Sequence, residues 1–232
     1  PITLLMLTAE ALQITAFILP TAFITLLYFT MLMIKKLQEI DFVKLCGTFG
    51  LSAVVISGFY ALVHFKTLLP TEIYGFDGVL MILLCLAFAW GSDAFAYFCG
   101  RAWGKHKLAP VVSPNKTVEG FIGGFFGSVF FGLAICVAYS YLAPLITGQP
   151  FVALRGQSYF ILVIMALISC PLGVAGDLFA SAIKRQCKIK DYGTIFSGHG
   201  GILDRFDSVL FITPFVAMLT SFCVNSLGTV FF

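Results

Sequence analysis

The sequence predicts an all-α fold, a polytopic bundle of transmembrane helices, because it is too apolar and too poor in charge for a soluble domain. Of its 232 residues, 59% are hydrophobic and 11% are charged, and the mean hydropathy is +1.00. A water-soluble core cannot bury that much apolar surface. A bilayer requires roughly 20 apolar residues for each helical span, and the sequence contains several stretches of this length.

Six stretches have the length and composition of a transmembrane helix. We expect them near residues 10–34, 46–64, 78–99, 118–143, 158–180 and 206–230. Residues 1–9 resemble the end of a further, truncated span, and no signal or transit peptide can be read at Pro1. Because no linker or internal repeat divides the chain, we expect one integral membrane domain over residues 1–232.

The basic residues predict the orientation of these spans, since Lys and Arg accumulate in loops that stay in the cytoplasm. Twelve of the 14 Lys and Arg residues fall in three loops that alternating spans place on one side, and Lys66 and Arg155 are the exceptions. We therefore expect these three loops to face the cytoplasm, with a bacterial inner membrane as the location. The C-terminus would then face away from the cytoplasm.

Two features predict helix packing rather than chemistry. The seven cysteines lie mostly within the spans, without a C-x-x-C pair, so we interpret them as small apolar packing residues. Gly120, Gly124 and Ser128 are spaced four apart, which is the pattern that lets membrane helices approach closely.

Acidic residues near the ends of apolar spans are the first indication of function. An ionised Asp93 or Asp177 in the bilayer costs several kcal/mol unless it meets a partner or water. Either could form a structural ion pair, Asp93 with Arg101 or Asp177 with Lys184. However, Asp177, Ser181 and Lys184 are spaced i, i+4 and i+7, so an acid, a hydroxyl and a cation share one helical face. Such a face suits a metal-bound phosphate.

The segment from residue 184 to residue 207 is dense in cations, glycines and acids. Lys and Arg neutralise phosphate oxygens, glycines let backbone N–H groups approach them, and carboxylates hold Mg²⁺. A loop that only contacts anionic lipid headgroups would also be basic, but it has no use for glycines around a histidine or for two aspartates. For His199 we favour contact with phosphate or with the surroundings of the metal, while a structural hydrogen bond and a general-base role stay open. The segment therefore predicts a polyphosphate site with a divalent metal.

A second basic segment, residues 100–120, precedes the fourth span. Ser113 is a candidate N-cap with Pro114 at the first helical position. Alternatively, Ser113, Lys116 and Thr117 at a helix N-terminus would favour a bound phosphate. Both interpretations can hold together.

These residues resemble the signature of the phosphatidate cytidylyltransferases, also called CDP-diacylglycerol synthases. The family pattern runs Ser, two residues, Lys-Arg, four residues, Lys-Asp, a small residue, His-Gly-Gly and a closing Asp-Arg-hydrophobic-Asp. With the similar upstream segments Ser-Asp-Ala-Phe-Ala-Tyr and Ser-Pro-Asn-Lys-Thr-Val-Glu-Gly, the resemblance covers roughly residues 78–215. Asn115 stands where a second Lys is expected, and Ser197 where Pro is common. The chain fills the signature with Ser181, Lys184, Arg185, Lys190, Asp191, Gly193, His199, Gly200, Gly201, Asp204, Arg205 and Asp207.

The resemblance implies transfer of the cytidylyl group of CTP to phosphatidic acid, which yields CDP-diacylglycerol and pyrophosphate. It also implies Mg²⁺ with K⁺ beside it, a cavity that faces the cytoplasm, and a homodimer. We expect CTP, phosphatidic acid and membrane lipids as partners, and no nucleic acid. The expected catalytic residues are Lys184, Arg185, Lys190, Asp191, His199 and Arg205; the substrate-binding residues are Ser113, Lys116, Thr117, Ser181, Gly200 and Gly201; and the metal ligands are Asp93, Asp177, Asp204 and Asp207.

Two alternatives are kept. A membrane kinase that uses CTP to phosphorylate a polyprenol-type lipid would also need a metal and basic loops, although the spacing of the signature argues against it. An ion or anion transporter could use intramembrane acids as its pathway, but no pair of broken helices occupies corresponding halves. P-loop and Rossmann motifs are missing from the sequence.

Overall fold

The computed structural model describes residues 27–28, 30–31, 34, 42–70, 76–147, 156–193 and 200–227. The first expected span, residues 10–34, lies almost entirely outside the described residues. The chain divides into two compact units, residues 1–53 and 54–232. The second unit carries the candidate site, and the expectation of one domain over the whole chain stays a prediction.

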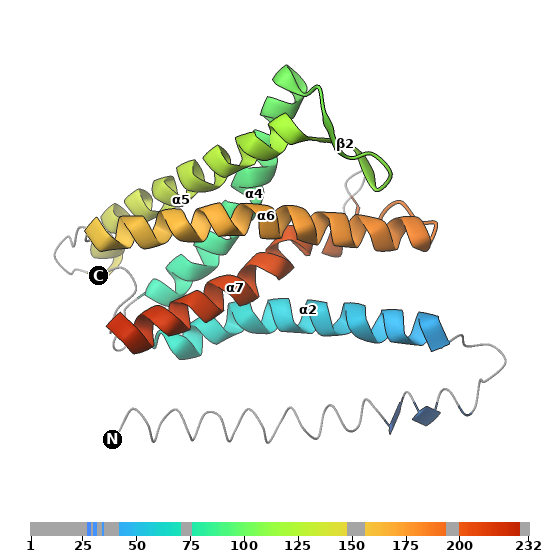
Figure 1. Cartoon of the computed structure of the whole chain (residues 1–232). Helices are drawn as coiled ribbons and strands as arrows, with labels where there is room; N and C mark the ends of the chain where they lie inside the picture. The colour runs from blue at the N-terminus through green and yellow to red at the C-terminus, as the bar shows by residue number, and fades with distance from the viewer. Residues whose placement is uncertain are drawn as a thin grey trace. The chain divides into compact units, whose positions relative to one another are not determined.

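In the part of the chain that the structure describes, five helices are long and apolar enough to cross a membrane. This confirms the all-α, polytopic fold, and the five helices correspond to the last five expected spans. Helices suit a bilayer because they satisfy their own backbone hydrogen bonds. The helices (Figure 1) are α2 (Phe42–Leu68), α4 (Asp77–Trp103), α5 (Val118–Thr147), α6 (Gly156–Gln186) and α7 (Leu203–Leu227).

Helix α4 lies at the centre of the second unit and packs against α5, α6 and α7. Its buried face carries large apolar side chains such as Leu84 and Phe88, which meet Met165 of α6 and Ile212 and Val216 of α7. Phenylalanines on the outer faces of the helices stay exposed, as expected for side chains that contact lipid. The core therefore fixes the ends of α4, α6 and α7 relative to one another.

The contact between α4 and α5 depends on small residues, as the sequence predicts. A Cβ at Gly120 would lie 2.6 Å from the carbonyl oxygen of Ala96, and one at Gly124 would lie 2.8 Å from the Ser92 Oγ. The Ser128 hydroxyl donates a hydrogen bond to the Phe88 carbonyl oxygen (3.1 Å). The packing interpretation of this stripe is confirmed.

The cysteines are all free thiols. Cys85, Cys136, Cys170 and Cys223 are buried, which confirms the packing interpretation for them, whereas Cys46 and Cys187 are exposed and do not pack in a core.

A short antiparallel hairpin connects α4 to α5 and consists of β1 (Lys107–Ala109) and β2 (Ser113–Thr117). The expected N-cap at Ser113 is therefore wrong, because pairing with β1 keeps this stretch extended and the helix begins at Val118. Thr117 caps it instead, since its Oγ1 accepts a hydrogen bond from the Gly120 N–H (3.1 Å).

Helices α6 and α7 extend further toward the charged loop than their hydropathy predicts. Helix α6 ends at Gln186 rather than near residue 180, and α7 begins at Leu203 rather than near residue 206. Basic side chains are favourable in the last turn of a helix and acidic ones in the first. Lys184 and Asp204 consequently stand on helices, at adjoining ends.

Candidate active site

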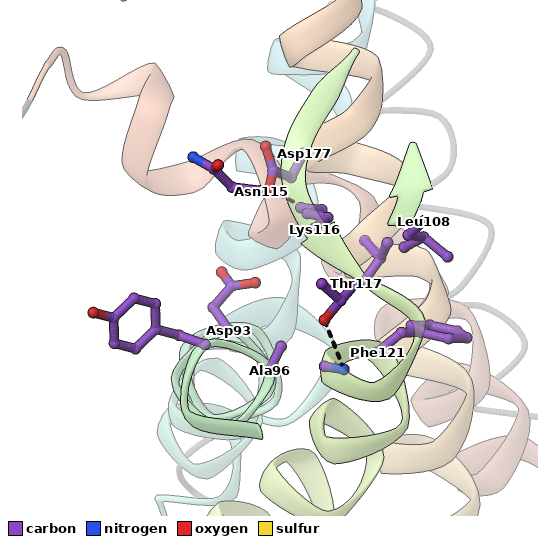
Figure 2. A pocket seen from close by; sticks show the side chains of 11 residues that line it. Asp93, Ala96, Leu108, Asn115, Lys116, Thr117, Phe121 and Asp177 are labelled. Carbon is purple, nitrogen blue, oxygen red and sulfur yellow. Dashed lines mark hydrogen bonds and ion pairs between the residues drawn. The ribbon is translucent and has the colours of Figure 1, made fainter. Parts of the chain in front are cut away.

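Charged side chains from several elements meet where α4 and α6 end and where α5 and α7 begin. A pocket of about 250 Å³ opens there, and Figure 2 shows the side chains that line it. Its polar wall combines acids from two helices with a lysine from the hairpin, and its apolar wall includes a phenylalanine. The lining residues are Asp93, Ala96, Tyr97, Leu108, Asn115, Lys116, Thr117, Gly120, Phe121, Val174 and Asp177.

Lys116 and Asp177 form an ion pair across this pocket, with 2.5 Å between Nζ and Oδ2. The Ser181 hydroxyl donates a hydrogen bond to the other oxygen of Asp177 (3.1 Å), which confirms that these two side chains share a helical face. The alternative pairing of Asp177 with Lys184 is wrong. The Lys116 ammonium is buried and, among the described residues, has no further acceptor. It can therefore bind an oxygen of a ligand.

Asp93 is exposed at the pocket, and Ser208 of α7 lies beside its carboxyl group. The alternative pairing of Asp93 with Arg101 is not observed, since the Arg101 guanidinium donates to the Tyr97 hydroxyl (3.1 Å). Asp93, Asp177 and Asp207 lie near enough for their charges to interact. Three carboxylates gathered in this way repel one another unless cations lie between them.

The chemistry of these three carboxylates fits a hard divalent cation. Mg²⁺ binds oxygen ligands, usually one or two carboxylates with substrate phosphates and water completing its octahedral shell. As they stand, no three His, Cys, Asp or Glu side chains among the described residues lie close enough together to hold an ion. These carboxylates therefore fit a site in which two of them bind the metal together with phosphate oxygens of a substrate.

Asp204, also expected as a metal ligand, has both carboxylate oxygens engaged. Oδ1 pairs with the Lys184 ammonium at 2.8 Å, and only 8% of the Asp204 side chain is exposed. Oδ2 accepts hydrogen bonds from the backbone N–H groups of Tyr192 (2.8 Å) and Gly201 (2.9 Å). We call Asp204, Lys184, Tyr192 and Gly201 the loop clamp, because these contacts join the end of α6 to the start of α7. The metal-ligand role of Asp204 stays a prediction.

Gly200 and the side chain of Tyr192 also contribute to the geometry of the loop clamp. Gly200 has φ of +82°, a conformation that favours glycine, and a Cβ there would lie 3.0 Å from Asp204 Oδ2. The Tyr192 hydroxyl donates a hydrogen bond to the Ala180 carbonyl oxygen (2.9 Å). Burial, with nearby negative charges, raises the pKa of Tyr192 to about 12, so the hydroxyl stays a donor at neutral pH.

The structure brings some of the expected site residues together and leaves others apart. Asp93, Lys116, Thr117 and Asp177 line the pocket, whereas Ser113 does not. His199 lies outside the described residues. Ser181 is bonded to Asp177, Lys184 and Gly201 belong to the loop clamp, and Gly200 lies beside it. Four further expected residues are exposed and do not line the pocket: Arg185, Lys190, Asp191 and Arg205.

Sequence reasoning missed two residues of this region. Glu119 accepts hydrogen bonds from the backbone N–H groups of Lys105 and His106; an acid in the first turn of a helix is a signal that could have found it. The Trp90 indole N–H donates to the Arg205 carbonyl oxygen (3.3 Å), and its ring contacts Phe206. No sequence pattern indicates this contact, because it joins two distant helices.

These features define a polytopic helical membrane protein whose pocket, at one end of its spans, suits a phosphate-bearing ligand. The chain belongs to the Cytidylyltransferase family, whose model matches residues 2–223. The resemblance noted in the sequence is thereby confirmed.

The chain is also similar to curated proteins from staphylococci. The chain is 43% identical over 143 residues to a phosphatidate cytidylyltransferase of Staphylococcus epidermidis, an alignment that covers 62% of this chain and 50% of the relative. It is 41% identical over 143 residues to the proteins of that name from Staphylococcus saprophyticus and Staphylococcus aureus, with the same coverage. The chain spans about half the length of the curated relatives it matches.

Proposed function

We propose that the protein transfers the cytidylyl group of CTP to phosphatidic acid and releases pyrophosphate. The observation that carries this proposal is the buried Lys116 ammonium, held by Asp177 in a pocket at the end of an apolar bundle. A cation at this place can bind a phosphate that arrives either from water or on a lipid headgroup. The names of the staphylococcal relatives supply the substrates.

In the proposed reaction, a phosphate oxygen of phosphatidic acid attacks the α-phosphorus of CTP in line. A new P–O bond forms while the bond from the α-phosphorus to the bridging oxygen breaks, and its electron pair leaves with pyrophosphate. No nucleophile from the protein is required, because the lipid phosphate is already ionised at neutral pH. Lys116 would offset the charge that develops in the pocket, helped by the exposed Arg185, Lys190 and Arg205.

A divalent metal, Mg²⁺, forms part of this proposal, with K⁺ beside it as the resemblance implies. Asp177 and Asp207 would hold it, with Asp93 nearby. They have fewer protein donors than Asp204, since Asp177 meets Lys116 and Ser181 and Asp207 accepts from the Ser208 N–H. When bound, the metal supplies positive charge to the phosphates of the nucleotide. Ser181 keeps the Asp177 carboxylate oriented.

We further propose that the pocket faces the cytoplasm at a bacterial inner membrane and that the protein acts as a homodimer. The orientation is supported by the cations that surround this end of the bundle, including Lys105, Lys107 and Lys190. CTP would then enter from water, while the acyl chains of phosphatidic acid stay among lipids.

The test is Mg²⁺-dependent formation of a CDP-lipid from labelled CTP and phosphatidic acid by the purified protein in detergent. Asp177→Asn is the test variant. Asp77→Asn is its matched control, because Asp77 also lies on a helix and accepts a hydroxyl hydrogen bond, from Tyr139 (3.0 Å), but does not line the pocket. We expect product from the parent and from the control, and almost none from Asp177→Asn.

A folded parent that forms no CDP-lipid with several acyl chains would contradict the proposal. Phosphorylation of a polyprenol under the same conditions would then support the kinase alternative.

A further inference from the structure

The position of Lys116 depends on how the hairpin is held. Lys116 stands on strand β2, not on a helix. Among the residues that the structure describes, β2 pairs only with the three residues of β1, with an irregular register between Lys107 and Ala109. A two-stranded ribbon of this size is marginally stable by itself. Something outside the strands must therefore fix Lys116 in the pocket.

Glu119 supplies that support. Its carboxylate, in the first turn of α5, accepts hydrogen bonds from the backbone N–H groups of Lys105 (3.1 Å) and His106 (3.2 Å). It also lies 2.7 Å from His106 Nδ1. In addition, the Val118 N–H donates to the His106 carbonyl oxygen (2.9 Å). The chain entering the hairpin is thereby tied to the helix that follows it.

The base of the hairpin is also closely packed. Thr117, the residue after Lys116, is buried against the end of α4: a Cβ at Gly100 would lie 2.8 Å from its Oγ1. With Thr117 fixed below and Glu119 holding residues 105 and 106 beside it, the strand has little freedom to move Lys116 away from Asp177. Glu119 itself does not line the pocket, so its influence on a ligand passes through Lys116.

We propose that Glu119 is a positioning residue, whose carboxylate fixes residues 105 and 106 and thereby holds Lys116 at the pocket for binding a phosphate oxygen. The role of Lys116 toward phosphate rests on the proposed function, whereas the fixation of the hairpin does not. Two experiments separate these statements.

The first experiment measures amide hydrogen exchange in the full chain in detergent. Glu119→Ala should speed exchange at residues 105 and 106 about tenfold or more, since charge-assisted hydrogen bonds are lost. Glu119→Gln, which keeps one acceptor, should have a smaller effect, and residues 80–89 in the core of α4 should be unchanged. Unchanged exchange at residues 105 and 106 in Glu119→Ala overturns the proposal, whatever reaction the protein catalyses.

The second experiment is a double-mutant cycle on the rate of CDP-lipid formation. Glu119→Ala should lower kcat about tenfold when Lys116 is present, and less than about twofold in a Lys116→Met background. The Mg²⁺ concentration for half-maximal rate should not move. Asp77→Asn, the matched control, should have the same effect in both backgrounds.

If Glu119→Ala is equally harmful in both backgrounds, its effect is general destabilisation and the positioning role is wrong. If the parent forms no CDP-lipid, the proposed function fails, and hydrogen exchange alone decides whether Glu119 fixes the hairpin.

Discussion

Among the described residues, two lysine–carboxylate pairs lie at this end of the bundle, and they differ in what else they contact. In the loop clamp, the Asp204 carboxylate accepts from Lys184 and from two backbone N–H groups, and 8% of its side chain is exposed. In the pocket, Asp177 meets Lys116 and Ser181, and 26% of its side chain is exposed beside open space. Both oxygens of Asp204 are occupied by protein donors on a largely buried side chain, whereas the Lys116–Asp177 pair borders a pocket that has room for a ligand. The Lys184–Asp204 pair therefore stabilises the fold, whereas the Lys116–Asp177 pair can also bind a ligand.

The largest expected effect comes from the pocket pair. Asp177→Asn should lower the rate of CDP-lipid formation by about 10²–10³-fold, because it removes a proposed metal ligand and the negative charge that holds Lys116 at the pocket. The melting temperature should change little, since this pair is open to the pocket. Initial rates and thermal melting in detergent measure the two quantities. A fully active Asp177→Asn variant would show that the pocket pair is not needed for the reaction.

The loop clamp should respond in the opposite way. Asp204→Ala should lower the free energy of unfolding by about 2–3 kcal/mol, because two backbone N–H groups and a largely buried lysine lose their acceptor. Chemical denaturation in detergent measures this loss. A variant of unchanged stability whose Mg²⁺ requirement rises steeply would instead make Asp204 a metal ligand.

Gly200 offers a milder test of the loop clamp. Gly200→Ala should destabilise the protein by about 1 kcal/mol, since its positive φ is strained for alanine and the new Cβ would press on Asp204. Gly50→Ala is the matched control, because that glycine is helical with nothing within 4 Å, and alanine favours a helix. Equal melting temperatures for the two variants would argue against a strained clamp.

The smallest effect concerns pH. The pKa of Tyr192 is raised to about 12 from 10.0, so its neutral form stabilises the fold at pH values below 10. That contribution should be lost as the pH rises from 10 toward 12, and Tyr192→Phe should lack this dependence. Melting curves of both proteins across this range measure the difference, and parallel curves would contradict the assignment.

The fold was largely predictable because each span depends on a local property, a long apolar stretch. The helix ends were less predictable, because hydropathy falls at charged residues whereas α6 continues through Lys184 to Gln186. Ser113 was mistaken for a cap because pairing with β1, a tertiary feature, overrides its local preference. Asp204 and Asp207 consequently lie on one helix, since α7 begins at Leu203.

The site was predictable as a set of residues but not as a set of contacts. The sequence singles out Asp177 as an acid near the end of a span, and Lys184 and Asp204 as residues of the signature. The partners of these side chains, however, depend on packing between segments far apart in the chain. Lys116 lies on β2 and Asp177 on α6, so their ion pair depends on the tertiary position of the hairpin. Spacing along a helix predicts neighbours such as Asp177 and Ser181, but it cannot predict a partner from another element.

The hydrogen bond from the Trp90 indole to the Arg205 carbonyl oxygen also places an intrinsic fluorescent reporter at the start of α7. The sequence contains two tryptophans, Trp90 and Trp103, so Trp103→Phe leaves a single tryptophan, which contacts the first turn of α7. Its emission should report movement of that turn when a nucleotide or a lipid arrives. Ligand arrival could thus be followed in real time, without attaching a dye.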